Sequence, residues 1–281
     1  METGENNPIH IETGNFDINL SSDYHLSIQL GIEHFSYCLL NTTSFTYDYV
    51  KKYPLNSKDN TAIEISEIIN EDAILKANFF SQSVAFTNLP STLVPSKLYK
   101  EEEAKTLLAF NTKFIGKVLA DKIISQQAYL IYSVPESILT IVSNFFPEAK
   151  YKAQESILIQ QYSQLNNGKK NAYLYLNEQK VSLTIFDSDK MIFNNSFKYI
   201  NKEDLLYYVL FSFEQLNISP ETIDLTVFGN IEDTDESFSL MYEYIRNIKL
   251  GKRPNQFTFP DEFNSISEHK YFGLFTQILC V

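Results

Sequence analysis

The sequence is poor in the residues that build metal sites. It has two cysteines, Cys38 and Cys280, and neither stands in a CxxC or CxxH spacing. Its four histidines are scattered along the chain, so the pattern predicts no zinc site. We assign no metal ligand from the sequence, and we expect both cysteines to be buried free thiols, as is common in a reducing compartment.

Positive charge is also scarce. The 281-residue chain has 23 lysines and arginines against 35 acidic residues, which gives a net charge of −12. Proteins that bind nucleic acid usually have a basic surface, so we expect no nucleic-acid partner, although a local basic patch could exist. No apolar run approaches the ~20 residues that cross a bilayer, and the polar start does not resemble a secretory signal. These features predict a cytoplasmic protein with no membrane span.

Alternation of apolar and polar residues predicts the strands of the first half, and helical spacing of apolar residues predicts its helices. Weak strand signals also occur within residues 1–20, where we expect an edge strand. The elements predicted after it are strands at 26–30, 35–40 and 45–49, a helix at 61–76, a strand at 83–87, a helix at 95–110, strands at 117–122 and 128–132, and a helix that ends at Pro147.

A polar stretch that contains glycine, residues 164–170, predicts a boundary between two lobes, residues 1–165 and 166–281. The pattern of the first lobe then returns. The predicted elements are strands at 172–176, 181–185 and 191–197, a helix capped by Asn201, a strand at 223–228, and a helix from Asp233 through Ile248.

The two halves match when one is shifted by 146 residues. The paired positions are Ile28 and Leu174, Leu30 and Leu176, Phe35 and Val181, and Leu39 and Ile185. The turns between the strands coincide as well. Each half therefore follows the order β-β-β-α-β-α, and the repeat predicts an α/β protein made of two copies of one unit.

Three antiparallel strands followed by a helix and a parallel strand resemble the ribonuclease-H-like unit. Two such units in tandem resemble the actin, sugar-kinase and Hsp70 superfamily. More closely, and over nearly its full length, the chain resembles an uncharacterised family of Bacteroidota with an actin-like ATPase fold. This likeness rests on residues 26–31 with 35–38, 92–95 with 98–99, and 271–275 with Cys280. It implies two ribonuclease-H-like lobes, each a mixed sheet with helices, and no activity.

The ATPases of this superfamily place an Asp-x-Gly turn after the first strand of each lobe, where aspartate holds Mg²⁺ and glycine lets the backbone approach phosphate. Here the corresponding residues are Gln29 with Gly31, and Tyr175 with Asn177. The adenosine loop usually has paired glycines, whereas Gly229 stands alone and is either a tight turn or a remnant ligand loop. These five residues are the candidate cofactor positions of a degenerate cleft, and no catalytic residue is assigned.

The leading hypothesis is therefore a non-catalytic binding or scaffold module without a cofactor. A protein or peptide partner would occupy the cleft between the lobes, and Tyr47, Tyr49 and Tyr53 are candidate contacts for it. His34 is interpreted as a non-catalytic strand residue. The alternative is a degenerate nucleotide-binding protein or ATPase that uses the same cleft, and a third hypothesis is a component of a filament or secretion-type assembly.

Overall fold

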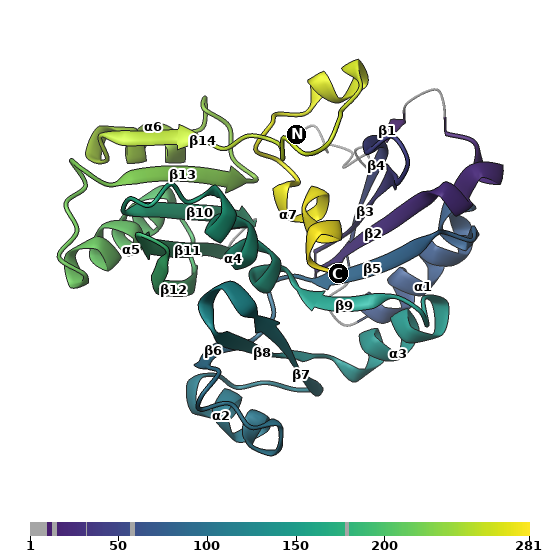
Figure 1. The fold of residues 1–281 in the computed structure, drawn as a ribbon, viewed down its shortest axis with the longest axis horizontal. Helices are drawn as coiled ribbons and strands as arrows, with labels where there is room; N and C mark the ends of the chain where they lie inside the picture. The colour runs from purple at the N-terminus through teal and green to yellow at the C-terminus, as the bar shows by residue number, and fades with distance from the viewer. Residues whose placement is uncertain (1–9, 13–15, 32, 57–59, 178–179) are drawn as a thin grey trace, which may run out of the picture. The chain divides into compact units, whose positions relative to one another are not determined.

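The computed structural model describes residues 10–12, 16–31, 33–56, 60–177 and 180–281 (Figure 1). The chain forms two compact units. The first unit contains Met1–Ile157, Asn255–Ser265 and Gly273–Val281, and the second contains Leu158–Pro254 and Ile266–Phe272. The expected lobes differ from these units in two respects. The division falls inside helix α4 (Gln154–Leu165), whose Leu158 and Tyr162 pack in the core of the second unit, and two later segments return to the first unit.

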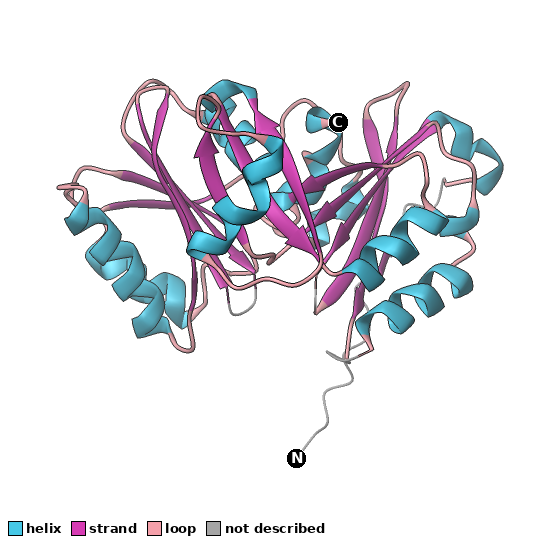
Figure 2. Cartoon of the chain, turned by 90° about the horizontal axis from the view of Figure 1, so that it is seen from below, coloured by secondary structure: helices cyan, strands magenta, loops and turns pink. Residues whose placement is uncertain are grey.

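The main sheet of the first unit has the strand order β1-β4-β3-β2-β5-β9. Strands β2, β3 and β4 form an antiparallel meander, and β5 and β9 continue it in parallel. Helices α1 and α3 pack against each other, and Figure 2 shows helices lying along the face of a sheet. The bounds are β1 (His10–Glu12), β2 (Tyr24–Leu30), β3 (His34–Asn41), β4 (Thr46–Pro54), α1 (Thr61–Glu71), β5 (Ser81–Phe86), α3 (Glu136–Phe145) and β9 (Lys150–Ala153).

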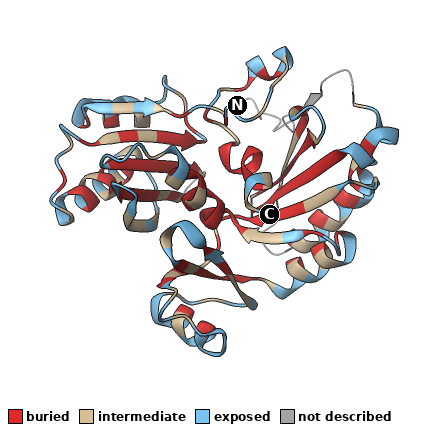
Figure 3. Cartoon of the chain, viewed as in Figure 1, coloured by how far each residue is buried: buried red, intermediate tan, exposed pale blue. Residues whose placement is uncertain are grey.

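All seven residues of β2 are buried, so both faces of this strand are covered (Figure 3). One face is apolar, and the other presents His25, Ser27 and Gln29, because side chains alternate along a strand. Residues 273–281, here called the C-terminal segment, cover part of the polar face. The Gln277 amide nitrogen donates to the backbone oxygen of Ile28 at 3.1 Å and to Ser83 Oγ at 2.8 Å.

Tyr47 and Tyr49 are core residues, so the expectation that they contact a partner is wrong. Tyr47 is fully buried, its hydroxyl donates to the Phe275 backbone oxygen at 2.6 Å, and its ring stacks on Phe259. Tyr49 is also buried and stacks on Tyr37. Alternation along β4 gave no sign of the contacts of Tyr47, because Phe259 and Phe275 lie more than two hundred positions away in the sequence.

Asp72, the residue after α1, gathers donors from two strands. Its Oδ2 accepts from Tyr37 Oη at 2.6 Å, from Tyr53 Oη at 2.7 Å and from Lys51 Nζ at 3.1 Å, while Oδ1 accepts from the Ile74 backbone at 3.0 Å. Burial alone would raise the pKa of Asp72, but these hydrogen bonds outweigh it and hold the pKa below its usual value. The carboxylate therefore joins the end of α1 to β3 and β4.

A separate three-stranded antiparallel sheet, β6-β8-β7, also belongs to the first unit. It contains β6 (Ser91–Pro95), a 3₁₀ turn at Glu101–Glu103, α2 (Ala104–Asn111), β7 (Lys117–Ile123) and β8 (Ala128–Val134). The predicted helix at 95–110 is thus too long. Pro95 is the last residue of β6, an edge strand, which is where a sheet tolerates proline, and the helix begins only at Ala104.

Asp121 of β7 anchors the start of α4. Its Oδ2 accepts from the Ala153 backbone at 2.7 Å and from Ser156 Oγ at 2.6 Å, which satisfies donors at the helix N-terminus. Burial raises the pKa of Asp121 despite these bonds. Strand β9 and helix α4 were both missing from the sequence prediction.

The sheet of the second unit has the order β12-β11-β10-β13-β14. Asn201 caps α5 as predicted, since its side chain accepts from the Asp204 backbone at 2.8 Å. The expected helix through Ile248 is wrong, because α6 ends at Tyr244 and the chain forms a strand parallel to β13. The bounds are β10 (Asn171–Asn177), β11 (Lys180–Asp187), β12 (Lys190–Lys198), α5 (Lys202–Gln215), β13 (Asp224–Gly229), α6 (Glu236–Tyr244) and β14 (Asn247–Leu250).

The strand registers confirm the duplication and its shift of 146. Leu30 lies opposite Phe35 in the first unit, and Leu176 lies opposite Val181 in the second. The order β4-β3-β2-β5-β9 is repeated as β12-β11-β10-β13-β14. The predicted α/β class and the repeated unit are therefore both correct.

Candidate functional site

Gln29 and Gly31 lie at the carboxyl end of β2 in the first unit, beside Thr87 at the end of β5. The Thr87 backbone donates to the Leu30 oxygen at 2.7 Å, which brings the two strand ends together. A Cβ on Gly31 would lie 2.6 Å from Thr87 Oγ1, so any larger residue would displace that hydroxyl. Packing against Thr87 is therefore one sufficient reason for glycine at this position.

Gln29 and Thr87 each bring a polar group to this end of the sheet. Both side chains are buried, and neither the Gln29 amide nitrogen nor Thr87 Oγ1 has a hydrogen-bond partner among the described residues. A Cβ on Gly273 would lie 3.4 Å from the Gln29 nitrogen and 3.0 Å from the Gln154 amide nitrogen, so both amides border Gly273. Buried polar groups are normally paired with protein, water or ligand. These residues form a small polar site that can donate hydrogen bonds.

His34 borders the same turn, and its environment keeps the ring neutral. Burial, together with the charge of Lys52, lowers the pKa of His34 to about 3. A histidine with this pKa neither carries a positive charge at neutral pH nor acts as an efficient base there. His34 is the first residue of β3, which confirms that it is a strand residue.

Tyr175 and Asn177 lie at the equivalent end of β10 in the second unit. Tyr175 is buried in a group that we call the aromatic cluster, which consists of Leu158, Tyr162, Tyr173, Tyr175, Phe186, Phe228 and Phe272. Tyr162 of α4 stacks on Tyr173 with ring centroids 4.5 Å apart. The phenol of Tyr175 is therefore part of a packed core, while Asn177, at the last position of β10, is half-buried.

Gly229 meets a backbone requirement at the end of β13. Its φ is +93°, and a Cβ there would lie 2.2 Å from the Leu176 backbone oxygen. The Asn230 backbone donates to that oxygen at 2.8 Å, and the Gly229 backbone donates to the His269 oxygen at 3.1 Å. The tight turn alone explains why this residue is glycine.

A cavity of about 570 Å³ opens at the carboxyl ends of β10 and β13. The starts of α5 and α6 both line it, and the Lys202 ammonium and Glu236 carboxylate form an ion pair at 2.6 Å that joins the two helix starts. Helix N-termini favour anionic groups, and this edge of an α/β sheet commonly binds ligands. Leu176 and Asn230 line the cavity, beside the predicted positions; its full lining is Leu176, Tyr199, Ile200, Asn201, Lys202, Glu203, Asn230, Ile231, Asp235, Glu236 and Ser237.

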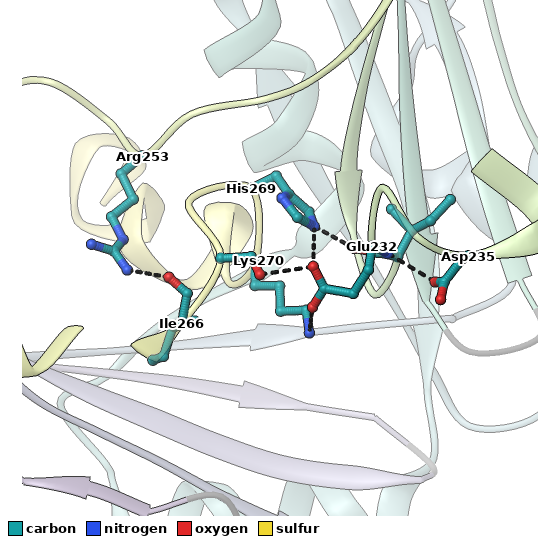
Figure 4. A network of polar contacts seen from close by, with 8 residues as sticks. Glu232, Asp235, Arg253, Ile266, His269 and Lys270 are labelled. Atoms are coloured by element: carbon teal, nitrogen blue, oxygen red, sulfur yellow. Dashed lines mark hydrogen bonds and ion pairs between the residues drawn. The ribbon is translucent and has the colours of Figure 1, made fainter. Parts of the chain in front are cut away.

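A polar network fixes the loop that follows Gly229 (Figure 4). Glu232 is at its centre: it accepts from Ser267 Oγ at 2.8 Å and forms an ion pair with Lys270, while its backbone donates to Asp235 at 2.8 Å. His269 contacts the Ile231 backbone oxygen. Burial would raise the pKa of Glu232, but the bonds from Lys270 and Ser267 lower it.

Sequence reasoning missed this network because Glu232 and Lys270 are far apart in the chain. The helix expected to begin at Asp233 begins later, at Glu236, and Asp235 is the residue before it. Gln154 was missed along with α4. The motif at 271–275 was noticed in the sequence, but nothing there indicated that Gly273 borders two buried amides.

The described residues include no group of three or more histidine, cysteine, aspartate or glutamate side chains placed to hold a metal ion. No helix among them is long and apolar enough to cross a membrane. Both cysteines are free; Cys38 is buried as expected, whereas Cys280 is only half-buried.

A family model described as "Protein of unknown function (DUF3822)" matches residues 13–248. The chain belongs to this family. Members of DUF3822 have no function in that description, so the family contributes no assignment of activity. No curated protein matches the chain.

The solved structures that are similar to this DUF3822 chain include the following two. One is a Bacteroides thetaiotaomicron protein with actin-like ATPase fold and unknown function, with a TM-score of 0.83, 19% identity, and coverage of 95% of this chain and 100% of that one. The other belongs to a PilM–PilN type IV pilus biogenesis complex, with a TM-score of 0.58, 12% identity, and coverage of 92% and 98%. These likenesses establish the actin-like fold and confirm the resemblance found in the sequence.

Proposed function

We propose that this chain is a non-catalytic protein of the actin-like fold that acts as a binding or scaffold module. One observation carries the proposal: Tyr175, at a position where the related ATPases have aspartate, is packed in the aromatic cluster. The other such position is Gln29, a buried amide. Neither side chain is a carboxylate that could bind Mg²⁺. The neighbouring His34, with a pKa of about 3, is poorly suited to serve as a general base.

A protein or peptide is the partner class that we propose. The solved complex named for PilM and PilN supports this choice, since it contains a chain of the same fold in an assembly of two proteins. The strongly acidic composition, with a net charge of −12, also argues against nucleic acid.

The test of the non-catalytic proposal is phosphate release from ATP with Mg²⁺ by the purified full chain. We expect no release above the rate of the buffer. The variant Gln29→Leu removes the buried amide, and Tyr242→Ala, an exposed position on α6, is the matched control. Hydrolysis by the unaltered chain that Gln29→Leu abolishes and Tyr242→Ala retains would overturn the proposal.

A second candidate function is nucleotide binding without hydrolysis. The 570 Å³ cavity at the ends of β10 and β13 favours it, because two helix N-termini face that space. A nucleotide at one hundred times its Kd would stabilise the folded chain by about 2.7 kcal/mol. A rise in melting temperature with ATP or GTP that Lys202→Ala removes would support this candidate. An unchanged melting temperature across a nucleotide panel would contradict it.

A further inference from the structure

A hydrophobic groove of about 330 Å³ runs between α5 and α6 on the second unit. Its base consists of leucines that also pack against the core of the unit, and its sides are aromatic rings. Acidic residues stand at its ends. The lining residues are Glu203, Leu206, Tyr207, Leu210, Phe211, Glu214, Leu240 and Tyr244. We refer to this feature as the α5–α6 groove.

The aromatic rings of the α5–α6 groove are unusually open to solvent. Tyr207 is 58% exposed, Phe211 43% and Tyr244 53%. Tyr207 and Phe211 stack with centroids 5.5 Å apart and an interplanar angle of 18°. Tyrosine and phenylalanine are typical anchors of protein interfaces, and clustered exposed apolar surface marks interaction sites. Leaving these rings in water is unfavourable unless a partner covers them.

The residues of α5 that line the groove recur at the spacing with which a second helix lying beside α5 would contact it. Successive turns of one face of α5 carry first Glu203, then Leu206 and Tyr207, then Leu210 and Phe211, and finally Glu214. The two carboxylates are therefore about 16 Å apart along the axis. Apolar contacts in the middle of the groove are enclosed by a negative charge at each end.

The charges at the two ends indicate the chemistry of the partner. Neither Glu203 nor Glu214 forms an ion pair with another described residue, although the Lys202 ammonium that pairs with Glu236 is close enough to interact with Glu203. A second copy of this chain, with its own net charge of −12, would bring further negative charge to the groove. A basic partner would instead be attracted.

We propose that the α5–α6 groove binds an amphipathic helix of a partner protein, with apolar residues on the bound face and Lys or Arg near both ends. Binding of a helix in a groove through anchors at i, i+3, i+4 and i+7 is a common mode of recognition. The inference goes beyond the proposed function, because it names a surface and a partner chemistry on the second unit. It also holds or fails independently of ATP hydrolysis.

The test measures fluorescence anisotropy of a labelled synthetic helical peptide titrated with the full chain. The peptide has leucines at the four anchor positions and lysines near both ends. One control peptide has the same residues in shuffled order. A second control peptide has glutamate in place of each lysine. We expect the first peptide to bind, its binding to weaken with added salt because the charged contacts are exposed, and both controls to bind at least about tenfold more weakly.

Variants of the chain then locate the site. We expect Phe211→Ala with Tyr244→Ala to weaken binding by about tenfold or more. Tyr242→Ala, which removes an even more exposed ring outside the groove, should leave binding unchanged. We expect Glu203→Lys with Glu214→Lys to reverse the preference toward the glutamate peptide, whereas Glu102→Lys in the first unit does not. Circular dichroism confirms that each variant is folded. Equal binding of the shuffled peptide, or binding that the groove variants leave unchanged, would overturn the proposal.

Discussion

Replacing Asp72 with alanine should destabilise the first unit strongly. The substitution removes the acceptor of two tyrosine hydroxyls and one ammonium group. Hydrogen bonds to charged groups contribute about 1.5–3 kcal/mol each, but Tyr53 and Lys51 are half-buried and can bond to water instead. Tyr37 is fully buried, and its hydroxyl would lose its carboxylate acceptor. We expect the free energy of unfolding to fall by about 3–5 kcal/mol.

The dependence of this effect on pH separates the charge from the shape of the side chain. The pKa of Asp72 is lowered in the folded chain, so its ionised form stabilises the fold above the unfolded value of 3.8, and this contribution is lost as the pH falls through the folded pKa. The variant Asp72→Asn should therefore be less stable than the unaltered chain at pH 7, and the difference should shrink as the pH falls below 3.8.

Urea denaturation followed by circular dichroism or tyrosine fluorescence can measure these effects, because the chain has 18 tyrosines and no tryptophan. Tyr53→Phe is the matched control: it removes one of the hydroxyl donors, and we expect a loss of only about 1 kcal/mol. The reasoning would be refuted if Asp72→Ala were no more destabilising than Tyr53→Phe, or if the effect of Asp72→Asn were the same at pH 3 and pH 7.

Three further predictions concern buried groups. Gly229→Ala should lower the melting temperature more than Gly168→Ala. Both glycines have positive φ, but only at Gly229 would a Cβ meet backbone, 2.2 Å from the Leu176 oxygen. Equal losses in the two variants would contradict this. Burial lowers the pKa of His25 from 6.5 to about 4. As the pH falls from 6.5 to about 4, the unfolded chain binds a proton at His25 that the folded chain does not, so the free energy of unfolding decreases over this interval. The unfolding free energy of His25→Gln should vary less over that interval, and an identical pH profile would count against it. Asp121→Asn should destabilise the chain less than Asp72→Asn at pH 7, because burial raises the pKa of Asp121, and urea denaturation that gave the reverse order would disprove this.

The strands and the repeat could be predicted because they are local patterns. Alternation placed the meander of each unit within two residues of its observed bounds, except that β4 extends five residues beyond the predicted end, and the shift of 146 agrees with the observed registers. The strong helix α5 was found from its cap, Asn201. These features depend on neighbours along the chain, which is the information that a sequence carries directly.

Helix α4 was missed for a physical reason. Burial in α4 is not confined to an apolar face: the polar residues Gln154, Glu155, Ser156 and Gln161 are buried along with Ile157, Leu158, Ile159 and Tyr162. Such a helix has no amphipathic pattern to recognise. The polar glutamines between these residues weakened the signal further.

The candidate site was predictable in position but not in packing. The repeat placed Gln29 and Tyr175 at equivalent strand ends, and the structure has them there. Tyr175 is buried in a cluster with Tyr162 and Phe272, and the Gln29 amide lies next to Gly273. Contacts between such distant residues leave no periodic trace in the sequence.

The return of residues 255–265 and 273–281 to the first unit affects how the protein can form during synthesis. A ribosome completes the strands of that unit early, yet Tyr47 cannot donate to Phe275, nor Ile28 accept from Gln277, until more than two hundred further residues have been made. Domains usually fold in order from the N-terminus. Here the part of the polar face of β2 that residues 273–281 cover lacks that cover while the whole second unit is translated, so the nascent chain exposes a sheet surface that the finished protein conceals.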